Sequence, residues 1–197
     1  MKKSSFKKLK VGIVCYPSVG GSGIVATGLG RELARKGHQV HFISYDRPFL
    51  MEAHLPNVFF HQVEITGYAL FKYPDYTLPL AVKMVEVSDT YKLDIMHVHY
   101  AVPHATAALL AKSIANEQKM SFPNVVTTLH GTDITLIARD KNIMPVIKYS
   151  IEDSCGVTAV SESLKNDTVK ALSTKKKITV IHNFYTTTIE KKSRKVI

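Results

Sequence analysis

The chain has 197 residues, of which 45% are hydrophobic, and it carries a formal net charge of +10. This length supports one substantial core rather than two, so we expect a single domain. The sequence contains no apolar stretch of membrane-spanning length, and no signal-peptide pattern follows the basic N-terminus. We therefore expect a cytoplasmic protein without a membrane partner.

The positive charge is concentrated in residues 2–10, 175–177 and 191–195. These segments are the two termini and a loop, and no aromatic side chains alternate with them to stack on bases. We therefore expect a solvated basic surface and no nucleic-acid partner. Cys15 and Cys155 show neither a disulfide framework nor metal-ligand spacing, so we expect no metal.

Apolar runs of strand length alternate with helical patterns along most of the chain. The pattern predicts strands at 9–15, 39–44, 58–65, 95–99, 125–130, 157–161 and 178–181, and helices at 23–36, 78–91, 104–117, 145–153 and 162–172. Nearly continuous apolar strands such as "VGIVC" and "VVTTL" indicate burial on both faces. The predicted class is therefore α/β: a doubly wound, mainly parallel, Rossmann-like sheet with helices on both faces.

In such sheets the ligand lies outside the carboxyl ends of the strands. The segments that follow the predicted strands include "YPSVGGSG", "YDRPF", "HYAVPH", "HGTD", "SESL" and "HNF", which are polar and rich in glycine. The sequence therefore predicts one crevice, bordered by 20–23, 99–104, 130–133, Ser161 and Asn183.

The glycine loop "GGSG", residues 20–23, precedes a predicted helix, whose N-terminus favours a phosphate or a carboxylate. "GSGIVA" also matches the dinucleotide fingerprint, with Asp46 placed to bind a ribose. Against an NAD-linked oxidoreductase, five residues separate Cys15 from Gly21, whereas a fingerprint glycine follows its strand almost directly. A turn with no ligand remains a third interpretation.

Two further junctions carry polar groups. "HVHYAVPHA", residues 97–105, lacks the additional ligands of a metal site, so we expect Tyr100 and a neighbouring histidine to donate hydrogen bonds into the crevice. For His97, a core histidine with satisfied hydrogen bonds beneath the crevice is the alternative. "TTLHGTD", residues 127–133, brings a histidine, a hydroxyl and a carboxylate to one strand end. A hydrolase triad of Ser161, His130 and Asp133 is disfavoured because no "GxSxG" elbow is present.

Four segments of the chain carry a family resemblance: "CYPSVGGSGIVATGLGRELARKGHQVHFIS", "LDIMHVHYAVPHA", "TTLHGTDIT" and "VTAVSESL". Through them, the chain resembles the N-terminal half of family 4 glycosyltransferases from about residue 8 to about residue 184. These enzymes have the GT-B fold, in which two Rossmann-like domains face each other across a cleft. The specific motifs resemble the malate-glycosylating branch. This resemblance implies retaining, metal-independent transfer of N-acetylglucosamine from UDP-GlcNAc to L-malate, the first step of bacillithiol biosynthesis, without a cofactor.

The resemblance also implies roles for individual residues. Gly20 and Gly21 would offer backbone N–H groups near the diphosphate and the acceptor. The catalytic candidates are His130, at a sugar hydroxyl, and Asp133, which would orient the loop or the substrate. The candidates for binding the acceptor are Ser22, Tyr100, Thr127 and Lys148.

Residues 1–184 are expected to form the acceptor-binding domain and residues 185–197 a basic tail outside it. The resemblance implies a missing C-terminal donor domain, so the chain alone is expected to be inactive. A binding module without catalysis is the alternative, and a homodimer is left open.

Overall fold

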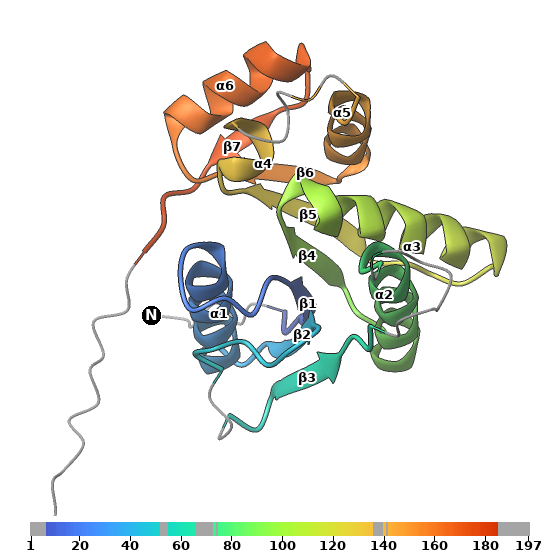
Figure 1. Cartoon of the computed structure of the whole chain (residues 1–197). Helices are drawn as coiled ribbons and strands as arrows, with labels where there is room; N and C mark the ends of the chain where they lie inside the picture. The colour runs from blue at the N-terminus through green and yellow to red at the C-terminus, as the bar shows by residue number, and fades with distance from the viewer. Residues whose placement is uncertain are drawn as a thin grey trace, which may run out of the picture.

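The computed structural model describes residues 7–51, 55–65, 73, 75–135, 140 and 142–184. Seven parallel strands form one sheet in the order β3-β2-β1-β4-β5-β6-β7 (Figure 1). They are β1 (Lys10–Val14), β2 (Gln39–Ser44), β3 (Val58–Gln62), β4 (Ile95–His99), β5 (Asn124–Leu129), β6 (Gly156–Ala159) and β7 (Ile178–Val180). The parallel, Rossmann-like sheet is confirmed, and each predicted strand is present within three residues at either end.

All five predicted helices are also present: α1 (Ser22–Arg35), α2 (Thr77–Tyr91), α3 (Thr106–Glu117), α5 (Met144–Asp153) and α6 (Glu162–Leu172). Two short elements were not predicted. They are η1, a π-helical turn at Ala101–Ala105, and α4 at Thr132–Thr135. Both follow strand ends at the predicted crevice, where "HYAVPH" and "HGTD" contain too few residues for a helical period to be recognised.

The two faces of the sheet are covered unequally. On one face, α2 and α3 pack on Met96 and Val98 of β4, and α5 and α6 pack on Val157 and Ala159 of β6. On the other face, α1 covers Ile13 and Phe42. Among the described helices, α1 alone contributes to the wall of the cavity over the remaining part of that face. Helices therefore lie on both faces of the sheet, as predicted, with α1 on one face and α2, α3, α5 and α6 on the other.

One expectation lies outside the described part of the chain, and another concerns its helices. The predicted basic tail, residues 185–197, is not among the described residues. None of the described helices is long and apolar enough to span a bilayer.

Candidate functional site

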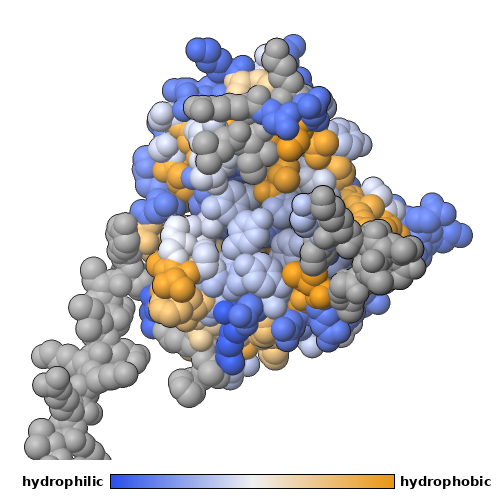
Figure 2. Space-filling view, in the orientation of Figure 1, coloured by the Kyte–Doolittle hydropathy of each residue, from blue (hydrophilic) through white to orange (hydrophobic). Residues whose placement is uncertain are grey.

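Three tyrosines come together at the carboxyl edge of the sheet. Val14 pairs with Ile43 and with Val98, so the residue two positions further along each strand is a tyrosine at the same level: Tyr16, Tyr45 and Tyr100. The ring centroid of Tyr16 lies 6.4 Å from that of Tyr45 and 5.7 Å from that of Tyr100. Figure 2 shows a face of the molecule on which weakly polar residues occupy the middle and hydrophobic residues form separate patches.

The glycine loop leads into the N-terminus of α1. Gly21 is the N-cap residue, and no side chain caps the helix or places an acidic group in its first turn. The first backbone N–H groups of α1 and its positive dipole end are therefore uncompensated by the described side chains, an arrangement that suits an anion. Gly20 and Gly21 are exposed there, while Ser22 is buried as the first residue of the helix.

Gly23, the last glycine of the loop, explains how the loop folds back. A Cβ at Gly23 would lie 2.5 Å from the carbonyl oxygen of Ser18 and 2.9 Å from that of Tyr16. The loop backbone therefore passes directly over the first turn of α1, which a larger side chain would prevent. This close approach keeps the strand end and the helix N-terminus together.

Gly21→Ala is expected to lower the free energy of unfolding by about 1–2 kcal/mol. Gly21 has φ +55° and ψ −125°, a conformation that residues with a Cβ rarely adopt, yet a Cβ there would meet nothing within 4 Å. The cost is therefore one of backbone conformation alone. Gly20→Ala is the matched control, because its Cβ also meets nothing within 4 Å and no positive φ is required. Urea denaturation measures the free energy of unfolding of both variants. Equal losses of this free energy in Gly21→Ala and Gly20→Ala would contradict the conformational explanation.

Histidines link the ends of β4 and β5. His130 Nε2 lies 2.8 Å from His99 Nδ1, and the ring centroids of these residues are 5.1 Å apart. His97 stacks on His99 at 4.7 Å, and Tyr100 lies 5.1 Å from His130. Because Tyr100 also contacts Tyr16, the rings connect the end of β1 to the ends of β4 and β5. The predicted grouping of Tyr100 with His130 is thus present.

These histidines are neutral near pH 7. Burial is the main cause that lowers the pKa of His97, His104 and His130 to about 4, and it lowers the pKa of His99 well below its usual value. A neutral His130 can exchange hydrogen bonds with a ligand but supplies no charge. Since Nε2 faces His99, Nδ1 is the ring nitrogen that remains for a ligand.

Asp133 holds two loops together. Its Oδ1 accepts a hydrogen bond from Gly131 N at 3.0 Å, and its Oδ2 accepts one from Ala101 N at 3.1 Å. The side chain is buried, which raises the pKa of its carboxyl group, while the backbone hydrogen bonds act in the opposite direction. Of the two predicted roles, the contacts match orientation of the loop, because Asp133 fixes the segment after β5 against the segment after β4.

Two predicted acceptor-binding residues do not reach this edge. Thr127 is 0% exposed, and its Oγ1 lies 2.8 Å from Ser154 Oγ, in the layer between the sheet and α5. Lys148 Nζ lies 3.5 Å from the carbonyl oxygen of Ser173, which follows α6 at the amino edge of the sheet. In this structure their contacts are structural, and the geometry corrects the expectation that they face the crevice.

The other interpretations of the polar junctions gain no geometric support. Ser161 Oγ accepts a hydrogen bond from Leu164 N and caps α6. Asp46, the proposed ribose ligand, is exposed and accepts a hydrogen bond from Arg47 N. Within the described ranges, no group of three or more His, Cys, Asp or Glu side chains is arranged to hold a metal ion.

Sequence reasoning did not single out Tyr16 or the bridge from His99 to His130. A signal for Tyr16 was present, since a tyrosine follows "VGIVC", "VHFIS" and "IMHVH", three apolar runs predicted to be strands. No comparable signal identified the bridge, because its two rings come from different strands.

The comparisons with known proteins concern the sequence and the fold. The chain is 50% identical over 177 residues to the N-acetyl-alpha-D-glucosaminyl L-malate synthase of Bacillus anthracis, an alignment that covers 90% of this chain and 45% of that protein. The chain thus spans about half the length of the curated relatives that it matches.

Solved structures show the same fold. A glycosyltransferase from Rickettsia africae ESF-5 aligns with a TM-score of 0.63 at 21% identity, over 90% of this chain and 43% of that one. The catalytic domain of starch synthase IV from Arabidopsis thaliana aligns with a TM-score of 0.59 at 17% identity, over 90% of this chain and 52% of that one. The model of the family described as "Glycosyltransferase Family 4" matches residues 19–188 of this chain. This chain therefore belongs to Glycosyltransferase Family 4.

Proposed function

We propose that this chain is the acceptor-binding half of a retaining glycosyltransferase that transfers N-acetylglucosamine from UDP-GlcNAc to L-malate. The observation that carries the proposal is the 50% identity to the malate synthase over 90% of this chain. The uncapped N-terminus of α1, beside the Tyr16, Tyr100 and His130 rings, supports it, because malate is a dianion.

Each residue then has a defined role. The N–H groups that follow Gly20 and Gly21 bind anionic oxygens of the acceptor or of the departing diphosphate. Ser22 belongs to the same anion-binding helix N-terminus, because it is the first residue of α1. The Tyr100 hydroxyl donates a hydrogen bond to a malate carboxylate. His130, which is neutral, uses Nδ1 to bind a hydroxyl of the sugar. Asp133 is a positioning residue, because it acts through the two loops that carry Tyr100 and His130.

In the reaction, the malate hydroxyl oxygen forms a bond to the anomeric carbon while the bond from that carbon to the diphosphate breaks. The diphosphate leaves with the electron pair and accepts the hydroxyl proton. Orientation of the two substrates and stabilisation of the departing charge supply the catalysis, so the step uses no protein nucleophile. The proposal requires a donor-binding half of comparable size, and the chain alone binds the acceptor without sustained turnover.

L-Malate is expected to raise the melting temperature of the purified chain by about 5–10 °C at a hundredfold excess over its dissociation constant. UDP-GlcNAc and UDP are expected to raise it less and NAD not at all. Stabilisation by NAD without stabilisation by malate would overturn the proposal in favour of the oxidoreductase. Malate-dependent release of UDP by the chain alone would contradict the requirement for a donor half.

Tyr100→Phe sharpens this test. Loss of one hydrogen bond to a carboxylate is expected to weaken malate binding about tenfold. Tyr149→Phe is the matched control, because Tyr149 is exposed on α5, away from this edge. Equal malate affinities in the two variants would remove Tyr100 from the site.

A second candidate function is a binding module without catalysis. Addition of a separately expressed donor half distinguishes the two candidates. Malate-dependent release of UDP by the mixture supports the transferase, and its absence while malate stabilises the chain supports the module.

A further inference from the structure

Tyr16 is the centre of a cluster of rings at the carboxyl edge of the sheet. Its ring centroid lies 4.6 Å from that of His104 and 5.7 Å from that of Tyr100. Tyr76 stacks on it at 6.4 Å, with an angle of 26° between the ring planes. His104 is 0% exposed, and its Nδ1 donates a hydrogen bond to the carbonyl oxygen of His99. The Tyr16 ring is therefore held in one place by its neighbours.

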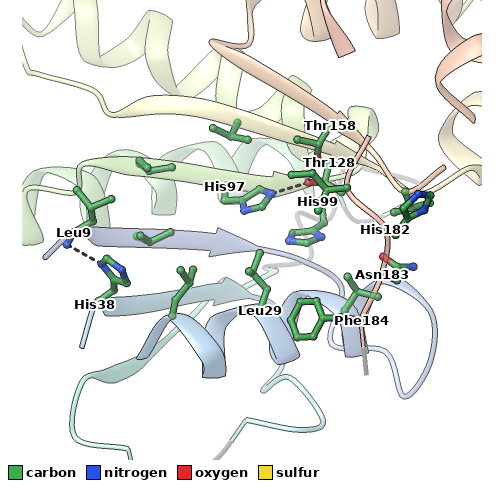
Figure 3. Close-up of a pocket in the computed structure, with 17 residues that line it drawn as sticks. Leu9, Leu29, His38, His97, His99, Thr128, Thr158, His182, Asn183 and Phe184 are labelled. Atoms are coloured by element: carbon green, nitrogen blue, oxygen red, sulfur yellow. Dashed lines mark hydrogen bonds between the residues drawn. The ribbon is translucent and has the colours of Figure 1, made fainter. Parts of the chain in front are cut away.

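These rings lie on the face of the sheet that α2 and α3 cover. Tyr16 and Tyr100 continue the alternation of Val14 and Val98, which belong to the core beneath α2 and α3. Figure 3 shows the side chains on the opposite face, among them His97. The Tyr16 cluster therefore belongs to the side of the crevice where α2 and α3 begin.

The hydroxyl groups of Tyr16 and Tyr100 are free to bind a ligand. Neither makes a hydrogen bond within the described part of the chain, and neither is among its buried polar atoms without a partner. Both side chains are partly buried, so their hydroxyls are accessible at the edge of the cluster. Burial raises the pKa of Tyr16, and the neighbouring Tyr45 and Tyr100 act in the same direction. The Tyr16 hydroxyl therefore keeps its proton near pH 7 and can donate a hydrogen bond.

The order of the strands also orders these groups. β1, β4 and β5 are consecutive neighbours in the sheet, so Tyr16, Tyr100 and His130 follow one another along its carboxyl edge. Neighbouring strands lie ~4.8 Å apart, which is similar to the separation of the two carboxyl groups in a four-carbon diacid. An acceptor whose reacting hydroxyl lies near His130 therefore extends past Tyr100 toward Tyr16.

We infer that the Tyr16 hydroxyl donates a hydrogen bond to the acceptor carboxylate that is farther from the reacting hydroxyl, and that Tyr16 thereby selects dicarboxylates over monocarboxylates. This role rests on the proposed function, in which Tyr100 binds the nearer carboxylate. Lys148, the expected cationic partner of the acceptor, lies at the amino edge, so the farther carboxylate needs another donor when it loses its hydration. A hydroxyl on a ring that is already held in place supplies one at a low cost in conformational entropy.

L-Malate and (S)-2-hydroxybutyrate test this selection. They share the four-carbon chain, the 2-hydroxyl and the first carboxylate, and they differ in a carboxylate or a methyl group at the fourth carbon. Each is titrated into the whole chain at pH 7 with the melting temperature as readout, and malate is expected to bind more tightly. Tyr16→Phe keeps the ring and removes one donor, so we expect it to weaken malate binding about tenfold and to leave (S)-2-hydroxybutyrate binding unchanged.

Tyr100→Phe and Tyr149→Phe are the matched comparisons. Both acceptors have the carboxylate that Tyr100 binds, so Tyr100→Phe is expected to weaken both and to keep the preference for malate. Tyr149 is exposed on α5, and its substitution is expected to change neither affinity. A full preference for malate in Tyr16→Phe, or a preference that is lost in Tyr100→Phe alone, would overturn the inference.

The same titrations separate this role from the proposed function. If malate stabilises the parent chain and Tyr16→Phe keeps the parent's preference, Tyr16 does not select the acceptor, while the proposed function stands. If malate does not stabilise the parent chain, the proposed function fails and the role of Tyr16 fails with it.

A spectroscopic measurement on the parent chain does not depend on the stability of a variant. In ¹³C spectra of the chain labelled at tyrosine Cζ, saturation with malate is expected to shift the Tyr16 signal, and saturation with (S)-2-hydroxybutyrate is expected to leave it in place. A Tyr16 signal that malate leaves unchanged at saturation would overturn the proposal.

Discussion

Lowering the pH from 7 to 5 is expected to reduce the free energy of unfolding by about 4 kcal/mol through His97 and His104 alone. Burial lowers the pKa of each to about 4 in the folded chain, against 6.5 for an unperturbed histidine. Between these values the unfolded chain binds a proton at each site and the folded chain does not. Stability is therefore fully present above pH 6.5 and is lost as the pH falls toward 4.

Urea denaturation at several pH values measures this dependence. His97→Gln and His104→Asn are each expected to reduce the loss between pH 7 and 5 by about 2 kcal/mol, whatever their stability at pH 7. The comparison uses the slope against pH, so a variant that is simply less stable does not imitate the effect. A parent chain as stable at pH 5 as at pH 7 would contradict the buried, neutral state of these rings.

Asp133→Ala is expected to lower the free energy of unfolding by about 3 kcal/mol. The substitution removes the acceptor of Ala101 N, which is buried, and that of Gly131 N, which is partly buried. The loops after β4 and β5 would then no longer be held together. Because they carry Tyr100 and His130, we also expect the variant to lose stabilisation by malate. Asp133→Asn keeps one acceptor oxygen and is expected to cost about 1 kcal/mol.

Asp140→Ala is the matched control for this substitution. The Asp140 carboxylate also accepts a backbone N–H bond, from Asn142, but it is exposed, so its loss is expected to change stability by no more than about 0.5 kcal/mol. Chemical denaturation compares the three variants. If Asp133→Ala costs no more than Asp140→Ala, the carboxylate does not fix the two loops.

The fold was predictable because its signals are local. The strand period and the apolar runs each lie within one short segment, and alternation of strands and helices leads to a parallel sheet. The structure confirms β2 (Gln39–Ser44), β4 (Ile95–His99) and α6 (Glu162–Leu172) with the predicted bounds. It adds η1 and α4, whose loops close around Asp133 through a contact between segments 32 residues apart.

The site was predictable in part. Because the carboxyl ends of parallel strands meet at one edge, the sequence brings Gly21, Tyr100 and His130 to the same crevice. It does not determine the face on which a strand residue lies. Thr127 and Thr128 are neighbours in "VVTTL", and the alternation of the strand sends one to each face. The structure turns Thr127 toward Ser154 on one face and Thr128 toward His97 on the other.

The amino-acid sequence by itself determined the order of the elements, the parallel sheet and the edge at which the polar loops gather, because each follows from local periodicity and from the connection rules of parallel strands. The tertiary structure alone decided which side chains meet there. It paired His99 with His130 across 31 residues, placed Lys148 at the amino edge and left His99 Nε2 buried without a hydrogen-bond partner in the described part of the chain. Such contacts depend on the packing of helices against each face of the sheet, which no short segment of the sequence specifies.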